Sequence, residues 1–294
     1  MKEYKELFQK ACLLQFSVKS WQCSKVIDQR VMQMKMGSES EWLRGRKYLI
    51  NPELLGQINT ASHQARNVIQ RHALPFPITS IYLIPKESLR LVDERLEQYK
   101  TRFWHTVDEF VPQYMPAREE ARIELGELYN DDDYPENITK RFNFEWRYLA
   151  LGIPGKTSVL TPEIYEREKE KFQTLMDETR ELALAALREE FGDVIGHLVN
   201  RLSENGGKPK IFKGNMFNKL HEFLDEFGTR NLFQDDLLMA LAEQAKTIIS
   251  GTSAYNLQYN QSLRDKIQQD MLELKVSINE SIVDVPRRKL RLAA

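Results

Sequence analysis

The chain has 294 residues, of which 29% are charged, and its formal net charge is −1 at pH 7. Because acids and bases are almost balanced, no global field draws the chain to nucleic acid or to an anionic membrane. Its two cysteines, Cys12 and Cys23, fit a reduced chain without a disulfide framework and exclude a zinc site of four cysteines. The sequence shows no signal-peptide pattern, and no stretch of it approaches the roughly 18 consecutive apolar residues that a membrane-spanning helix needs. We therefore expect a soluble cytoplasmic protein.

The first elements alternate between strand and helix patterns. Apolar residues at every second place predict a strand over residues 13–20. Residues 32–40 are rich in Met, Gly and Ser, and we predict a loop there. A capping side chain, a proline and an acid at 51–53 begin a helix whose apolar positions, three and four apart, continue to His72. After two prolines, residues 78–84 read as a second, apolar strand.

A long helix is predicted after Pro85, with an apolar stripe close to a heptad seam. The stripe consists of Leu89, Val92, Leu96, Tyr99, Phe103, Val107 and Phe110. We interpret the first five of these residues as a surface for a partner helix, in the manner of a coiled coil. Pro112 and Pro116 are predicted to end this helix, and a separate short helix is expected over residues 119–128.

Residues 141–150 show the clearest strand pattern in the chain. Phe142, Phe144, Trp146 and Tyr148 alternate with charged and polar residues, which places the aromatic rings on one face of a half-buried strand. The glycines and proline of residues 152–155 close the strand and mark our predicted domain boundary.

The rest of the chain has helical period. We expect a helix over 161–202, shorter ones over 215–227 and 235–250, a final helix to Ile282, and a basic tail. The predicted fold is α+β and mostly α: a small sheet of about three strands with packed long helices, followed by a C-terminal helical bundle. The predicted domains are an α+β domain (1–154), a helical domain (155–284) and the tail (285–294).

Motifs that would indicate catalysis or a cofactor are incomplete. Gly155-Lys156-Thr157 resembles the end of a phosphate-binding loop, but Ala150 stands where the first glycine is needed. His221 and Asp225 lie one helical turn apart, a spacing that can chelate a metal, yet a solvated helix edge explains them as well. Three adjacent acids at 131–133 lack the alternate spacing of a calcium loop. We therefore predict no enzyme, no cofactor and no metal site.

Local groups of basic residues are the remaining candidate for a site. Arg44, Arg46 and Lys47 stand between Trp42 and Tyr48. Arg141 and Arg147 are predicted on the polar face of the aromatic strand. If these five basic residues converge in space, they could follow a nucleic-acid backbone. Scattered solubilising charge is the alternative, because acids are equally frequent.

The order of several segments resembles a family of uncharacterised bacterial and phage proteins, a domain of unknown function. The segments are 46–55 (Arg-Lys-Tyr-Leu-Ile-Asn-Pro-Glu-Leu-Leu), 77–85, 103–114 and 141–144. The resemblance extends to about Gly251. Members of that family are encoded on mobile elements and phages, near MoxR-like AAA+ ATPases and proteins with a von Willebrand A domain. The resemblance implies a partner or adaptor of such a machine and carries over no site residue.

Two functional hypotheses follow. The first is a non-enzymatic scaffold or adaptor subunit of a multiprotein bacterial or phage complex, working with other protein subunits such as a MoxR-like AAA+ ATPase and without a membrane. The alternative is a nucleic-acid-binding subunit of a ribonucleoprotein or DNA-processing complex.

Overall fold

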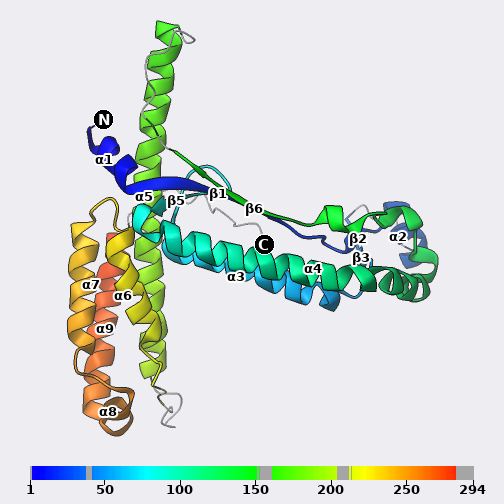
Figure 1. The fold of residues 1–294 in the computed structure, drawn as a ribbon. Helices are drawn as coiled ribbons and strands as arrows, with labels where there is room; N and C mark the ends of the chain where they lie inside the picture. Colours follow the sequence, from blue (N-terminus) through cyan, green and yellow to red (C-terminus); the bar gives the residue numbers. More distant parts are fainter. Residues whose placement is uncertain are drawn as a thin grey trace. The chain divides into compact units, whose positions relative to one another are not determined.

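The computed structural model describes residues 2–37, 42–150, 152, 161–203, 212 and 214–282 (Figure 1). A small sheet has the strand order β4-β5-β1-β6, and a separate antiparallel ribbon consists of β2 and β3. The strands are β1 (Ala11–Lys19), β2 (Ser24–Val26), β3 (Arg46–Tyr48), β4 (Leu74–Pro75), β5 (Ile81–Pro85) and β6 (Asn143–Leu149). The three strands predicted for the sheet are present as β1, β5 and β6, and the two-residue β4 pairs with β5.

Helices make up most of the described chain, as predicted. They are α1 (Lys2–Lys10), α2 (Gln29–Met36), α3 (Gly56–His72), α4 (Leu89–Leu125), α5 (Pro162–Leu202), α6 (Asn218–Arg230), α7 (Asp236–Ile249), α8 (Ala254–Tyr259) and α9 (Gln261–Ser281). Short 3₁₀ turns, η1 (Pro52–Leu55), η2 (Lys86–Ser88), η3 (Gly126–Leu128), η4 (Asp131–Asp133) and η5 (Ile138–Arg141), fill several of the connections.

The chain divides into two compact units that are not contiguous in sequence. Unit 1 comprises Met1–Leu14, His72–Leu89 and Tyr148–Ala294, and unit 2 comprises Gln15–Arg71 and Arg90–Arg147. Our predicted domains were instead contiguous, with a boundary at 154. The difference arises because α1, β4 and β5 bury their apolar residues with the C-terminal helices, a long-range association that composition along the chain does not reveal. The predicted basic tail lies outside the described residues.

The core of unit 2 is built by the aromatic face of β6 packed along α4. Phe142 meets Phe110 with ring centroids 5.9 Å apart, and Phe144 meets Phe103 at 5.4 Å. Further along the strand, the indole Nε1 of Trp146 donates to Asp93 at 3.0 Å. The alternation in the sequence therefore identifies the buried face of this strand correctly.

This packing corrects the interpretation of the α4 stripe as a surface for a partner helix. Val92, Leu96 and Phe103 are fully buried, and Leu89 and Tyr99 are half-buried. Because the rings of Phe142 and Phe144 already occupy the stripe, its apolar residues serve the chain's own core rather than an external partner.

Two local predictions were also wrong. Helix α4 continues through Pro112 and Pro116 to Leu125 instead of ending before them. Each proline removes one backbone hydrogen bond, but Tyr114, Ala117 and Ala121 are buried on the same helix, so packing outweighs that loss. The first part of the predicted loop at 32–40 belongs instead to helix α2. Asp28 caps this helix by accepting a hydrogen bond from the Arg30 amide at 2.8 Å.

Unit 1 is centred on α5, which packs most extensively against α9. At Gly196 of α5 the side chain of Lys275 on α9 lies close to the helix backbone: a Cβ atom there would lie 2.9 Å from Lys275 Nζ, and the flexible lysine could move to accommodate it. On α6, the Phe223 ring stacks on Phe191 of α5 at 4.8 Å. The C-terminal helical bundle predicted from the sequence is thus present (Figure 1).

Candidate functional site

The five predicted nucleic-acid-binding residues all belong to unit 2, but the structure gives them different roles. Arg44 and Arg46 are exposed beside and within β3, and Lys47 is largely buried next to them. Arg141 and Arg147 are also exposed, but Arg141 ends the 3₁₀ turn η5 rather than lying on the strand as predicted, and Arg147 lies within β6. The set is therefore distributed over at least two places of the unit.

Lys47 is held by a buried carboxylate. Its Nζ lies 2.6 Å from Oδ2 of Asp133 and also donates to the carbonyl oxygen of Leu128. Lys25, opposite Lys47 in the β2–β3 ribbon, donates to the other carboxylate oxygen. The side chain of Asp133 is only 4% exposed and that of Lys47 10%. Asp133 thus joins both strands of the ribbon to the segment after α4.

The two lysines decide the protonation state of Asp133. Burial by itself would raise the pKa of this carboxyl, but the hydrogen bonds and charges of Lys25 and Lys47 outweigh burial and lower the pKa below its usual value. Asp133 is therefore ionised at neutral pH, and Lys47 is unavailable for a ligand phosphate.

A stack of rings and guanidinium groups lies next to this ion pair in sequence. Tyr129 and Tyr134 stack with centroids 5.0 Å apart, and the guanidinium of Arg118 lies 5.2 Å from the centre of the Tyr134 ring. Arg118 also donates to the Tyr129 hydroxyl at 2.9 Å and to Asp131 at 2.8 Å. These contacts order the loop between α4 and β6.

Tyr134 is the buried member of this stack. Within the described residues its hydroxyl makes no hydrogen bond, and burial, followed by the nearby Tyr129 and Asp133, raises its pKa to about 12. The phenol therefore stays protonated at neutral pH. It has neither the ionisation nor a basic neighbour within hydrogen-bonding distance that a proton-transfer role would require.

Arg147 is partly neutralised on β6. Its guanidinium pairs with Glu145 at 3.3 Å, and the hydrogen bonds that Glu145 accepts from Asn143 and Arg147 lower the pKa of this carboxyl. Arg141 is exposed and makes no ion pair with another described residue. The polar face of β6 therefore carries mixed charge.

The described part of the chain offers few side chains that are suited to bind a metal ion or to act as a nucleophile. It contains no group of three or more His, Cys, Asp or Glu side chains placed to hold a metal ion. His221 and Asp225 both lie on the exposed side of α6. Cys12 and Cys23 are unpaired, and burial raises the pKa of both thiols, which favours the unreactive form. The Gly155-Lys156-Thr157 segment lies outside the described residues.

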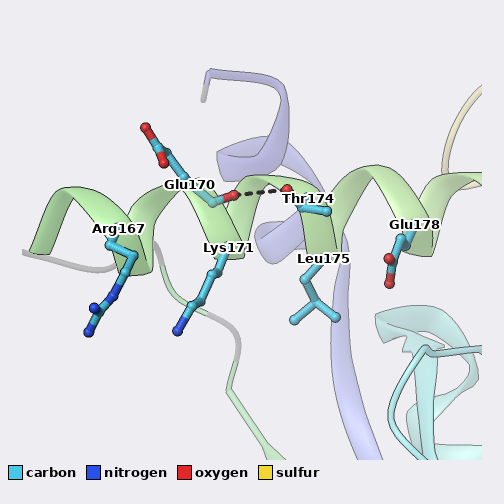
Figure 2. Close-up of a pocket in the computed structure, with 6 residues that line it drawn as sticks. All are labelled: Arg167, Glu170, Lys171, Thr174, Leu175 and Glu178. Carbon is cyan, nitrogen blue, oxygen red and sulfur yellow. Dashed lines mark hydrogen bonds between the residues drawn. The ribbon is translucent and has the colours of Figure 1, made fainter. Parts of the chain in front are cut away.

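A shallow depression occurs on the N-terminal half of α5 (Figure 2). It is lined by Arg167, Glu170, Lys171, Thr174, Leu175 and Glu178. All six side chains come from one helix and their charges balance. The depression therefore has neither the enclosure nor the convergent polar groups of a small-molecule site.

Sequence reasoning missed the role of Asp133. As a sequence pattern, the run of three acids was compared only with a calcium loop and was rejected because adjacent acids lack the alternate spacing. Lys25 and Lys47 lie 108 and 86 positions earlier in the chain, and only the fold brings them to Asp133. No local pattern in the sequence indicates this contact.

The fold and this site define a mostly helical α+β protein with an ordered polar cluster beside a short ribbon. A family model described as "Protein of unknown function (DUF3150)" matches residues 8–202, more than half of the chain, and the chain belongs to this family. This match confirms the resemblance to a domain of unknown function. No curated protein and no solved structure matches the chain. In the described part, no helix has the length and apolar character needed to cross a membrane.

Proposed function

We propose that this protein is a non-enzymatic scaffold or adaptor subunit of a multiprotein bacterial or phage complex that contains an AAA+ ATPase. One observation carries the proposal: residues 162–175 of α5, here called the α5 arm, form about four helical turns in which no residue is fully buried, and Phe172 and Leu175 near its end pack only partly buried against the core. A helix that extends past its own core presents surface to another molecule. The resemblance to proteins encoded near MoxR-like ATPases supports the identity of the partner.

Local interactions support the helix of the α5 arm where core contacts are few. Thr161 caps the helix through a 3.4 Å hydrogen bond from the Ile164 amide, and Pro162 occupies the first turn. Lys169 pairs with Glu166 at 2.9 Å, and Lys171 pairs with Glu168 at 2.7 Å. Arg167 and Lys171 line the depression of Figure 2, so a partner that seats there meets both charges.

The test is a tagged pull-down from the native host, with and without nuclease, followed by mass spectrometry. We expect an AAA+ ATPase to co-purify, to survive nuclease, and to be recovered at least fivefold less with the double variant Arg167→Glu, Lys171→Glu. The matched control, Lys246→Glu with Lys266→Glu, reverses two exposed charges elsewhere in unit 1 and should retain the partner. A chain that purifies alone and as a monomer would contradict the proposal.

A nucleic-acid-binding subunit is the second candidate function. The observation that favours it is the exposure of Arg44, Arg46 and Arg141, none of which pairs with a carboxylate of another described residue. Partners that nuclease treatment removes would favour this second candidate over the adaptor.

A further inference from the structure

The β2–β3 ribbon has two chemically different faces. Its register pairs Ser24 with Tyr48, Lys25 with Lys47, and Val26 with Arg46. Because side chains alternate along a strand, the central lysine pair points to one face and the two outer pairs point to the other. We call these the inner and outer faces.

The inner face is fixed in place. Both of its lysines bind Asp133, whose carboxylate is buried, and Lys47 also donates to the Leu128 carbonyl. A three-residue ribbon would be unstable alone, but these charge-assisted bonds tie it to the end of α4. The outer face is therefore presented on a rigid support.

The outer face combines an aromatic ring, an apolar side chain and arginine. Tyr48 is 62% exposed and Val26 is 52% exposed. The guanidinium Nη2 of Arg46 donates to the Ser24 hydroxyl at 2.8 Å, which holds the side chain across the ribbon. Arg44 is exposed just before the strand, and Trp42, 96% exposed, precedes it. Large side chains that remain this exposed on a fixed ribbon indicate an interaction surface.

The charge around this face differs from that of the whole chain. Residues 15–50 contain seven basic and three acidic residues, and Asp133, which binds Lys25 and Lys47, adds a fourth acid; a basic excess remains, whereas the full chain has a net charge of −1. None of the four outer-face residues is acidic. The complementary partner is therefore a polyanion.

Among polyanions, the ring of Tyr48 selects one with exposed planar groups. Phosphates suit the forked guanidinium groups of arginine, and unpaired bases stack on exposed aromatic side chains, which duplex bases cannot do. We propose that the outer face of the β2–β3 ribbon binds single-stranded nucleic acid, with Arg44 and Arg46 on phosphates and Tyr48 stacked on a base.

This inference rests on the second candidate function and goes beyond it, because it divides the predicted basic set. Arg44 and Arg46 contact the ligand, whereas Lys47 holds the ribbon. Arg141, at the end of η5, and Arg147, within β6, lie outside the outer face. Tyr48, which the sequence showed only as a residue flanking the basic group, and Val26, which the sequence did not indicate, join the site.

The experiment measures fluorescence anisotropy of labelled 20-nucleotide dT and rU strands with the full chain, from 50 to 300 mM salt. We expect binding that weakens with salt. The double variant Arg44→Glu, Arg46→Glu should weaken it at least tenfold and reduce the salt slope by about 1.4, at about 0.7 for each phosphate that is no longer neutralised. Tyr48→Ala should weaken binding about tenfold and Tyr48→Phe less than twofold, since phenylalanine still stacks.

The matched control is Arg95→Glu with Arg102→Glu, two exposed arginines of α4 in the same unit, which should bind like the wild type. No binding of either strand by the wild type would overturn both this inference and the second candidate function. Normal binding by the Arg44/Arg46 and Tyr48→Ala variants would overturn the ribbon site alone. The ribbon site would also be overturned if a labelled poly-glutamate peptide bound as tightly as the dT strand and if dT did not displace it.

Discussion

Helices α4 and α5 have similar lengths, 37 and 41 residues, but their apolar residues are distributed differently. Helix α4 has buried residues from Val92 in its first turn to Ala121 near its end. In α5 the first buried residue is Met176, fourteen positions after the helix begins. Helix length alone therefore does not distinguish the two helices: the buried stripe of α4 runs almost its whole length, whereas the first fourteen residues of α5 include no fully buried residue.

The largest expected effect comes from breaking the α4 stripe. Phe103→Ala removes a fully buried ring that contacts Phe142 and Phe144 and should lower the free energy of unfolding of unit 2 by about 3–5 kcal/mol. All four tryptophans, at positions 21, 42, 104 and 146, lie in unit 2, so urea unfolding followed by tryptophan fluorescence reports on this unit.

The matched change on α5 is Phe172→Ala. This ring is half-buried and meets Phe8 edge to face at 6.0 Å, so its loss should cost only about 1 kcal/mol, measured by circular dichroism. Equal costs at Phe103 and Phe172 would contradict the contrast between the two helices.

An effect between those of Phe103→Ala and Phe172→Ala is expected at the ribbon. Asp133→Asn removes the charge that holds Lys25 and Lys47 and should destabilise unit 2 by about 2 kcal/mol. The same fluorescence-monitored unfolding measures it, with Asp132→Asn in the neighbouring exposed position as control. A cost no larger than that of the control would mean that the ribbon is not held by Asp133.

The pH dependence of this contribution has a definite sign. The pKa of Asp133 is lower in the folded state than its usual value of 3.8. Its stabilisation should therefore be complete above that usual value and be lost as the pH falls through the depressed folded-state pKa. The stability difference between wild type and Asp133→Asn should stay constant from pH 7 to pH 5 and shrink below pH 4. A difference that instead shrinks between pH 7 and pH 5 would refute the assignment.

The smallest stability effect is predicted for the α5 arm. Arg167→Glu with Lys171→Glu alters exposed charges only, so the free energy of unfolding should change by about 0.5 kcal/mol or less while partner recovery falls. Circular dichroism under thermal unfolding checks the first part. A large drop in stability would mean that the arm is packed, which removes the basis of the adaptor proposal.

Local patterns in the sequence predicted much of the secondary structure. Alternation found β6 and its buried face, and the cap-proline-acid start at Thr161 found the beginning of α5. The prediction that the α4 prolines end the helix was wrong, because the packing of Tyr114, Ala117 and Ala121 that stabilises the helix is not visible in a local pattern.

The candidate site was harder to predict than the fold. The arginines at 44 and 46 stood out because aromatic residues flank them, but the ion pair of Lys47 with Asp133 joins residues 86 positions apart. The register of the ribbon, which separates Lys47 from Arg46 by face, depends on strand pairing that composition does not specify.

Hydrogen exchange measured by mass spectrometry, on the free chain and on the complex isolated with its protein partner, tests the central claim most directly. In the free chain, amides of the α5 arm should exchange much faster than those between Phe103 and Tyr114 of α4, because no residue of the arm is fully buried, whereas several residues of that α4 stretch are. In the complex the arm should become protected while α4 stays unchanged. An arm that is already protected in the free chain, or that gains no protection in the complex, would contradict the account.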